Sequence, residues 1–414
     1  MRHKLAVILL ITLLVAYIDR VNVSVLVADR TFLVDMGIAD DPVGKGMLMS
    51  VFLICFGIGS VVLSPLGDWL GPRKTMIISI LLWTVALIWG GLAAAFASML
   101  VSRVLLGFGE SMHFPMLSKF VKNWFPLHER GKANAIWLLG VNVGPLLGVP
   151  LVAWAITSFG WRANFYLLAA LGVIPVILLW KYTADHPHQY KGIGKAELDY
   201  IEAALREEKE KEARFDKGGV KENLMMIVRD YRVWLLVLAY SGTSSIWWGT
   251  VTWLPAYLKE ARGFSWAAMG LWSTLPYVFA IIVKLAAGYA VDKWRYPAQF
   301  YAAGLFGSAV FIYFGAFAES SMAATWLISL GIGTLAMGTP CAWLLLQQIL
   351  PGKVIGTGSG LMSGVSSGIS AAAPVMVGVF IALTGSYVGG LMFMVGWGVL
   401  GGIMCLVLAA KQKR

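Results

Sequence analysis

The chain has 414 residues, of which 58% are hydrophobic and only 13% are charged. Soluble domains carry about 25% charged residues, so this composition excludes an ordinary soluble protein and predicts an integral membrane protein. The formal net charge of +11 could suit nucleic acid, but the placement of the basic residues argues against such a partner. The three cysteines fall in apolar stretches, which indicates neither a disulfide framework nor a metal site.

The apolar stretches predict twelve membrane-spanning helices, since about 20 such residues cross a bilayer core. The predicted spans are 5–27, 44–66, 73–95, 98–121, 131–157, 163–183, 231–257, 265–291, 298–317, 323–349, 355–383 and 387–410. We therefore expect an all-α membrane protein with an N-terminal six-helix half, 1–183, and a C-terminal one, 231–414. The linker 184–230 contains KAELDYIEAALREEKEKEARF, whose helical apolar spacing predicts an amphipathic helix at the membrane surface.

Charged residues inside two predicted spans are the strongest functional signal. The fourth span contains Arg103 and Glu110, which are seven residues apart and so lie on nearly one face of a helix. The first span contains the adjacent Asp19 and Arg20. Because a charge at mid-membrane costs at least a few kcal/mol, these side chains must face protein or water. They form either a purely structural ion-pair network or a pathway for a coupled ion and an anion, and we favour the pathway.

The basic residues are distributed unevenly across the predicted membrane. With a cytoplasmic N-terminus, the loops and termini on that side hold 25 of the 33 lysines and arginines, the other side holds 5 and the spans hold 3. Since basic residues accumulate in cytoplasmic loops, we expect both termini in the cytoplasm. This asymmetry accounts for the net charge without nucleic acid.

Two cytoplasmic loops indicate an internal repeat. The loop after the second span reads SPLGDWLGPRK, with Asp68, Arg73 and Lys74, and the loop after the eighth reads GYAVDKWRYP, with Asp292. Each places an aspartate at the end of a span, followed by basic residues, at equivalent positions of the two halves. Membrane topology alone explains the basic residues but not the aspartate, so we favour a gating latch whose ion pairs break and re-form.

Together these motifs resemble the major facilitator superfamily and, within it, the anion:cation symporter family, which includes permeases for sugar acids and other organic acids. The resemblance covers nearly the whole chain and rests on AYIDRVNVSV, GDWLGPRK, RVLLGFGESMHFP, NWFPLHERGKANA, GWRANFYLLAALG and ADHPHQYKGIGKAELDYIE. It implies the major facilitator fold, transport rather than catalysis, and no cofactor. The implied partners are a small organic anion, H+ and the lipid bilayer. We expect a monomer in a cell membrane, the inner membrane of a bacterium.

By the same resemblance, Asp19 and Glu110 are expected to be the proton-coupling carboxylates. Arg20 and Arg103 are expected to be their partners, and one of the two helps to hold the substrate. Tyr17, two residues before the aspartate, resembles a substrate-site tyrosine. The resemblance thus gathers the proposed chemistry on the first and fourth spans.

Further candidate substrate residues lie in later spans: Asn142 in the fifth, Trp343 in the tenth and Ser363 in the eleventh. These regions have fewer polar side chains than sugar-acid permeases carry, which argues against a polyol acid. Lys284 in the eighth span either snorkels toward the cytoplasmic surface or faces the substrate. We favour the second reading, because another cation would suit a carboxylate or dicarboxylate.

The leading hypothesis is proton-coupled symport of a small organic anion, a carboxylate or sugar acid, by alternating access. The alternatives are a sodium-coupled anion symporter or an organic-acid exporter and, from another class, a non-transporting membrane sensor. The sequence contains no phosphate-binding G-x-x-x-x-G-K-S/T loop, which argues against nucleotide-driven pumping. It also offers no set of nucleophile, base and orienting residue, so we do not expect an enzyme.

Overall fold

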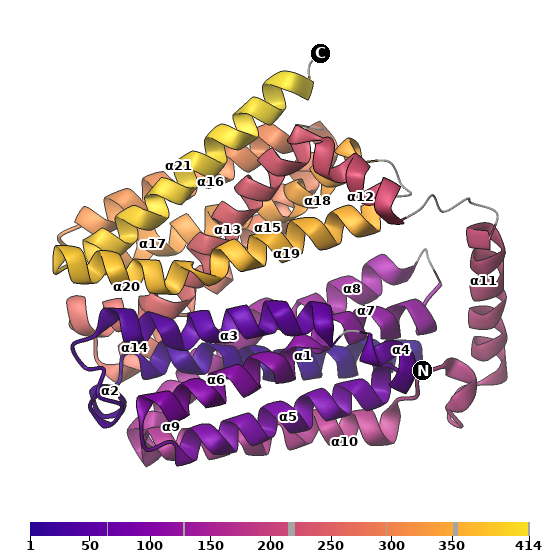
Figure 1. Cartoon of the computed structure of the whole chain (residues 1–414), viewed down its shortest axis with the longest axis horizontal. Helices are drawn as coiled ribbons and strands as arrows, with labels where there is room; N and C mark the ends of the chain where they lie inside the picture. Colours follow the sequence, from indigo (N-terminus) through magenta and orange to yellow (C-terminus); the bar gives the residue numbers. More distant parts are fainter. Residues whose placement is uncertain (64, 127–128, 214–219, 295, 351–354, 413–414) are drawn as a thin grey trace. The chain divides into compact units, whose positions relative to one another are not determined.

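A computed structural model of the chain describes residues 1–63, 65–126, 129–213, 220–294, 296–350 and 355–412. The described residues form helices and contain no strand, which confirms the predicted all-α class. The first helices are α1 (Arg2–Leu26), α2 (Arg30–Asp35), α3 (Pro42–Val62), α4 (Leu66–Leu70), α5 (Pro72–Leu92), α6 (Phe96–Ser111), α7 (His113–Trp124), α8 (Arg130–Leu138), α9 (Gly140–Leu171), α10 (Val173–Tyr182), α11 (Lys195–Ala213) and α12 (Val220–Arg229). They are followed by α13 (Tyr231–Ala256), α14 (Trp266–Trp272), α15 (Leu275–Trp294), α16 (Pro297–Phe317), α17 (Ser321–Leu335), α18 (Gly338–Ile349), α19 (Ile355–Ala371), α20 (Ala373–Thr384) and α21 (Tyr387–Gln412) (Figure 1).

Within the described ranges, nine helical stretches are long and apolar enough to cross a membrane. One of them, Lys132–Tyr182, contains both the fifth and the sixth predicted span. The fourth predicted span is divided into α6 and α7, of 16 and 12 residues. The seventh is α13, whose Trp, Tyr, Ser and Thr side chains lower its hydropathy. Every predicted span therefore corresponds to helix, as a twelve-helix fold requires.

The fourth and tenth predicted spans are interrupted at equivalent places. α6 and α7 have 16 and 12 residues, and α17 and α18 have 15 and 12. The third residue of the second helix is proline in both spans, Pro115 in α7 and Pro340 in α18. Proline lacks an N–H and its ring clashes with the carbonyl four residues earlier, which is where each first helix ends. The two spans therefore share a helix geometry, as the predicted internal repeat expects.

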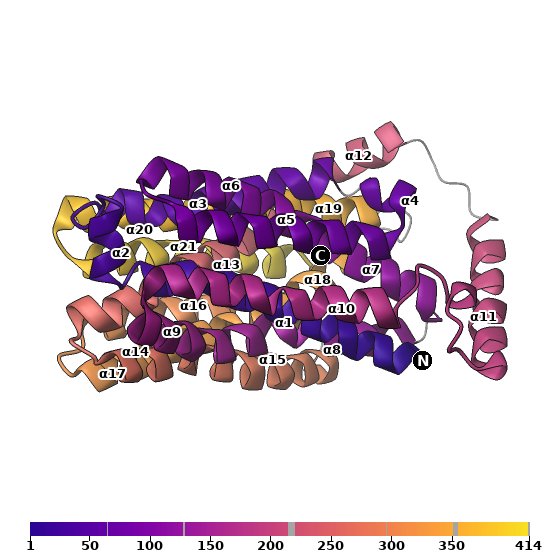
Figure 2. The same ribbon diagram turned by 90° about the horizontal axis from the view of Figure 1, so that it is seen from below.

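Packing divides the chain into two compact units. Unit 1 comprises Met1–Asn22 and Ile54–Asp216, and unit 2 comprises Val23–Leu53 and Lys217–Arg414. In unit 1, α5 packs against α6 and α9; in unit 2, α16 packs against α17 and α21, and α15 lies beside α17 (Figures 1 and 2). The division follows packing and passes through α1 and α3, so the predicted six-helix halves and linker stay a prediction.

Three glycines of α9, spaced four residues apart, bring this helix into close contact with α1 inside unit 1. A Cβ atom on Gly140, Gly144 or Gly148 would lie 3.0, 2.5 or 2.9 Å from the nearest atom of α1. Small residues at this spacing let two membrane helices approach closely. The contact of Gly144 is with the Cβ of Tyr17, so this seam fixes the part of α1 that carries the charged residues. α9 then bends at Gly160, whose φ of 83° and ψ of 165° are not helical.

The predicted amphipathic helix of the linker is observed as α11. Ile201 is fully buried, and the Tyr200 hydroxyl donates a 3.1 Å hydrogen bond to Glu129 in the loop after α7. The Arg2 guanidinium also reaches Glu129, at 2.8 Å, and lies over the Tyr200 ring. These contacts attach α11 to unit 1. Residues 214–219 of the predicted linker lie outside the described residues.

The first turns of α3 pack tightly on α20 within unit 2. A Cβ on Gly46 would lie 2.4 Å from a backbone carbonyl of α20, and one on Gly378 would lie 2.2 Å from a carbonyl of α3. Beside this seam, the Lys45 ammonium lies 3.5 Å from the Glu260 carboxylate, which also accepts a 2.5 Å hydrogen bond from Tyr387. Close backbone contact and an ion pair therefore hold this end of α3.

We expect Gly144→Ala to lower the free energy of unfolding by about 1–3 kcal/mol, because an added methyl overpacks the seam between α9 and α1. Thermal unfolding of the purified protein in detergent measures this loss. Gly57→Ala is the matched control, since no described atom of another helix lies within 4 Å of the position where its Cβ would stand. Equal stability of the two variants would contradict the assigned role of the seam.

Candidate functional site

Four charged side chains lie buried in unit 1, two from α1 and two from α6. Asp19, Arg20, Arg103 and Glu110 are each at most 4% exposed. The helical spacing had placed Arg103 and Glu110 on one face of their helix, and both are indeed buried on α6. Inside a membrane span such charges need protein partners, since lipid supplies none. The interactions of each side chain therefore define what this cluster can do.

Arg20 and Glu110 form an ion pair enclosed by aromatic rings. The Arg20 Nε donates a hydrogen bond to a Glu110 carboxylate oxygen at 2.5 Å. The guanidinium carbon lies 4.6 Å from the centre of the Tyr17 ring, 4.5 Å from Phe56 and 5.6 Å from Phe114. A desolvated cation–π contact is worth about 2 kcal/mol. The rings therefore hold the guanidinium in place in addition to the carboxylate.

Asp19 and Arg103 are bonded more weakly than the Arg20–Glu110 pair. Both carboxylate oxygens of Asp19 lack a hydrogen-bond partner among the described residues. Arg103 donates a 3.4 Å hydrogen bond to Ser102 and lies 5.4 Å from the Phe165 ring centre, while its Nε has no partner in the described part of the chain. Asp19 and Arg103 are within electrostatic range of each other. The structure thus brings one predicted pair together closely and leaves a buried carboxylate without a donor.

Two buried polar contacts lie near the cluster, and the first of them was missed by sequence reasoning. Asn164 of α9 donates a 2.7 Å hydrogen bond to Asn22, and both side chains are fully buried. Asn22 lies three residues after Asp19, on the same face of α1, so helical spacing could have found it. The His113 Nε2 lies 3.2 Å from the Thr12 hydroxyl. Both contacts tie α1 to neighbouring helices, one on each side of the charged residues along the chain.

The other predicted substrate residues are distributed over both units. Asn142 on α9 is buried, and its side-chain oxygen has no partner in the described ranges. In unit 2, Trp343 on α18 packs edge-on against Tyr240 at 6.2 Å between ring centres, and Ser363 on α19 is half-buried. Lys284 on α15 is half-buried and forms no ion pair with the described residues. The substrate roles of these residues stay predictions.

The loop before α5 docks on Asp185, which follows α10. The backbone N–H of Arg73 donates a 2.7 Å hydrogen bond to the Asp185 carboxylate. The Arg73 guanidinium donates to the carbonyl of Trp180 and lies over its ring. Gly71 has a φ of 80°, and a Cβ there would lie 2.6 Å from the Asp185 carboxylate, so the close approach requires glycine. Asp185 therefore caps α5 from another part of the chain.

The predicted gating residues are only partly described. The side chains of Asp68 and Asp292 lie outside the described residues, and Lys74 is exposed. Of this set, Arg73 has partners in the structure, and its backbone contact is with Asp185. Asp185 belongs to the ADHPH motif, in which no pattern had indicated a role for the aspartate. A capping carboxylate so far along the chain from its helix leaves no spacing signal.

We expect Asp185→Ala to destabilise the protein by about 0.5–2 kcal/mol, the usual cost of losing a helix cap. Thermal unfolding in detergent checks this value. Asp199→Ala removes an exposed aspartate of the nearby α11 and should leave the unfolding temperature unchanged. If Asp185→Ala unfolds at the same temperature as Asp199→Ala, the Asp185 carboxylate does not stabilise α5.

Comparisons with known proteins agree along the length of the chain. Residues 9–374 match the family described as Major Facilitator Superfamily. A probable sulfoacetate transporter of Cupriavidus necator is 29% identical over 408 residues, which cover 97% of this chain and 91% of the relative. A probable galactarate/D-glucarate transporter of Escherichia coli is 27% identical over alignments covering 100% of this chain and 94% of the relative. The inward-open xylose transporter of Escherichia coli has a similar fold, with a TM-score of 0.77, 17% identity, and coverage of 99% and 96%.

Proposed function

The chain belongs to the Major Facilitator Superfamily, and on this premise we propose that it couples inward proton movement to the uptake of a small organic anion. The family and the names of its relatives indicate a membrane transporter rather than an enzyme. The observation that carries the finer proposal is the buried cluster of two acids and two arginines on α1 and α6. Arginine suits a carboxylate or sulfonate substrate, and a buried acid suits a transported proton.

The substrate class is supported by the names of the relatives. Sulfoacetate, galactarate and D-glucarate are all acids that are ionised near neutral pH. Of the predicted substrate residues Asn142, Trp343 and Ser363, only the serine carries a hydroxyl, which favours a small anion with one or two acid groups over a polyol acid. The predicted substrate role of Lys284 would suit a dianion.

The proposed coupling step is an exchange of partners at Arg20. Glu110 binds Arg20 most strongly as a carboxylate, so a proton on Glu110 weakens the pair. The aromatic rings keep the guanidinium in position, and Arg20 then takes the acid group of the substrate in place of Glu110. Asp19 is a second proton site, because a buried carboxylate without a donor is costly as an anion.

Sequence patterns support the proposed orientation and the proposed gating residues. Basic residues concentrate on one side, which supports cytoplasmic termini in a bacterial inner membrane. Asp68, Arg73, Lys74 and Asp292 form the cytoplasmic latch that opens and closes during the cycle. The docking of Arg73 on Asp185 supports a latch in which the loop before α5 rests on a fixed carboxylate.

Uptake into proteoliposomes tests the proposal. With an inward proton gradient, the wild type should accumulate labelled sulfoacetate or another organic acid, because each proton carries about 2.3 kcal/mol per 100 mV of membrane potential. Glu110→Gln should abolish accumulation but retain exchange of substrate across the membrane, and Asp19→Asn should weaken accumulation. Glu319→Gln, which changes an exposed acid, should behave as wild type.

Two results would contradict proton coupling. One is normal gradient-driven accumulation by both Glu110→Gln and Asp19→Asn. The other is accumulation that follows an imposed sodium gradient and ignores pH, which would favour the sodium-coupled alternative. Binding without any accumulation would instead indicate a sensor.

We expect Lys284→Met to weaken anion binding at least tenfold, about 1.4 kcal/mol, because it removes the positive charge and keeps most of the apolar stem. Calorimetry with the anion that the wild type accumulates measures the effect. Lys284→Arg should retain part of the affinity. Lys293→Met, at an exposed position of the same helix, is the matched control. Unchanged affinity in Lys284→Met would mean that the lysine snorkels toward the surface.

A further inference from the structure

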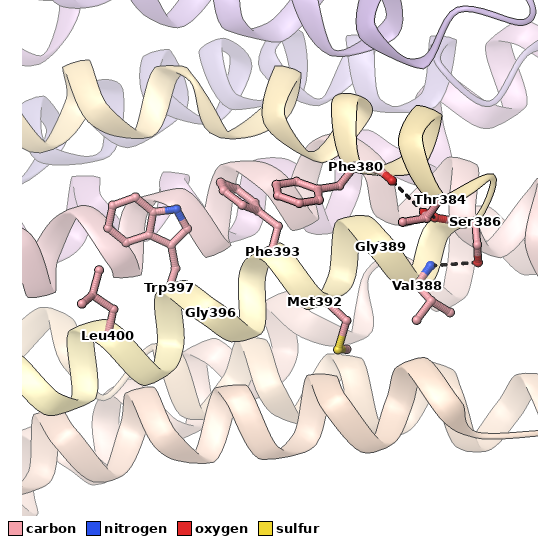
Figure 3. Close-up of a pocket in the computed structure, with 10 residues that line it drawn as sticks. All are labelled: Phe380, Thr384, Ser386, Val388, Gly389, Met392, Phe393, Gly396, Trp397 and Leu400. Atoms are coloured by element: carbon pink, nitrogen blue, oxygen red, sulfur yellow. Dashed lines mark hydrogen bonds between the residues drawn. The ribbon is translucent and has the colours of Figure 1, made fainter.

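A groove runs between α20 and α21 within unit 2 (Figure 3). It has a volume of about 690 Å³ and is lined by side chains from Phe380 on α20 to Leu400 on α21. The groove lies on one compact unit and contains none of the predicted substrate or proton-coupling residues. The groove is therefore separate from the candidate transport site.

The groove is closed at the turn between the helices and opens away from it. Next to the turn, a Cβ on Gly389 would lie 2.3 Å from the Thr384 hydroxyl, and one on Gly390 would lie 2.6 Å from Val377. Two turns further along α21, no described atom of another helix lies within 4 Å of the position for a Cβ on Gly396. The two helices are thus in contact at one end, and the glycine leaves space at the other.

The chemistry of the groove changes along its length. Phe380 and Phe393 stack across it, with 5.4 Å between ring centres, and Trp397 lies beyond them (Figure 3). At the turn, the Ser386 hydroxyl oxygen accepts a hydrogen bond from the Val388 N–H, which leaves its own hydrogen for an outside acceptor. None of the residues that line the groove is charged. The groove thus has an apolar length and a neutral polar end.

The dimensions match one leaflet of a bilayer. Val388 and Leu400 are twelve residues apart, which is about 18 Å along a helix, and half of a bilayer hydrocarbon core is about 15 Å. The polar end lies at the start of a membrane-length helix, Tyr387–Ala410, where ester groups meet the hydrocarbon. We propose that the groove holds one acyl chain of a phospholipid from the leaflet that surrounds the start of α21. The ester group of that lipid would lie at Ser386. The groove selects the chain and not the headgroup, since it offers no charge.

A second copy of this chain fits the groove less well. A two-fold contact places the same patch of both copies face to face, so two grooves would meet and both would stay hollow. A lipid chain is narrow, flexible and present at every exposed face of the protein. The concave shape therefore favours lipid over a symmetric partner.

Native mass spectrometry of the detergent-purified protein, with added phosphatidylethanolamine or phosphatidylglycerol, tests the proposal. The wild type should retain one lipid under conditions that strip the others, with affinities for the two lipids within about threefold. Gly396→Phe, which fills the open part of the groove, should lose that lipid. Val399→Phe changes an exposed neighbour on the same helix that does not line the groove and should retain it.

A fluorescence measurement on the folded wild type gives a second readout. Brominated phospholipids quench nearby tryptophans, and the part of the quenching lost in Trp397→Phe belongs to the groove. This part should saturate at a low fraction of brominated lipid. A linear rise with that fraction, retention of the lipid by Gly396→Phe, a strong preference for phosphatidylglycerol, or a dimer that Gly396→Phe abolishes would each overturn the proposal.

Discussion

The ion pair between Arg20 and Glu110 is the interaction on which unit 1 depends, because it places two full charges where lipid cannot solvate them. Breaking a buried pair by removing one partner typically costs about 3–5 kcal/mol, so the surrounding helices must deliver both partners reliably. The glycine seam of α9 fixes one face of α1 against a neighbour, and the aromatic rings confine the guanidinium. The glycines of α9 and the aromatic rings around Arg20 thus hold the two charges of the ion pair together.

The sequence predicted the helices and the face of α6 that carries charge, because both follow from hydropathy and from helical periodicity. It could not say which arginine would bind Glu110, since periodicity fixes a face of one helix and not the rotation of its neighbour. The aromatic ring of Phe56 was unremarkable among the apolar residues of its span. Pro115 and Pro340 were visible, yet the predicted spans ran through them. Asp185 caps α5 across more than 100 residues of chain, a contact that no local pattern encodes.

The two units use different chemistry within one repeated plan. The helix interruptions at Pro115 and Pro340 occupy equivalent spans, and both follow from the geometry of proline. The fourth span carries the buried Glu110 and Arg103 on α6, whereas the tenth span, α17 and α18, contains no charged residue. The two units share this backbone plan, while the buried acid and arginine of the fourth span have no charged counterpart in the tenth.

The distance along the chain between Arg20 and Glu110 has a consequence for biogenesis. The two residues are 90 positions apart, so a ribosome adding about 5–20 residues per second needs about 5–18 seconds to make the second after the first. During this interval α1 carries a charge that costs about 2.5–3.5 kcal/mol at the centre of a bilayer. Until α6 has been made, the Arg20 charge therefore lacks the Glu110 carboxylate that neutralises it in the folded protein.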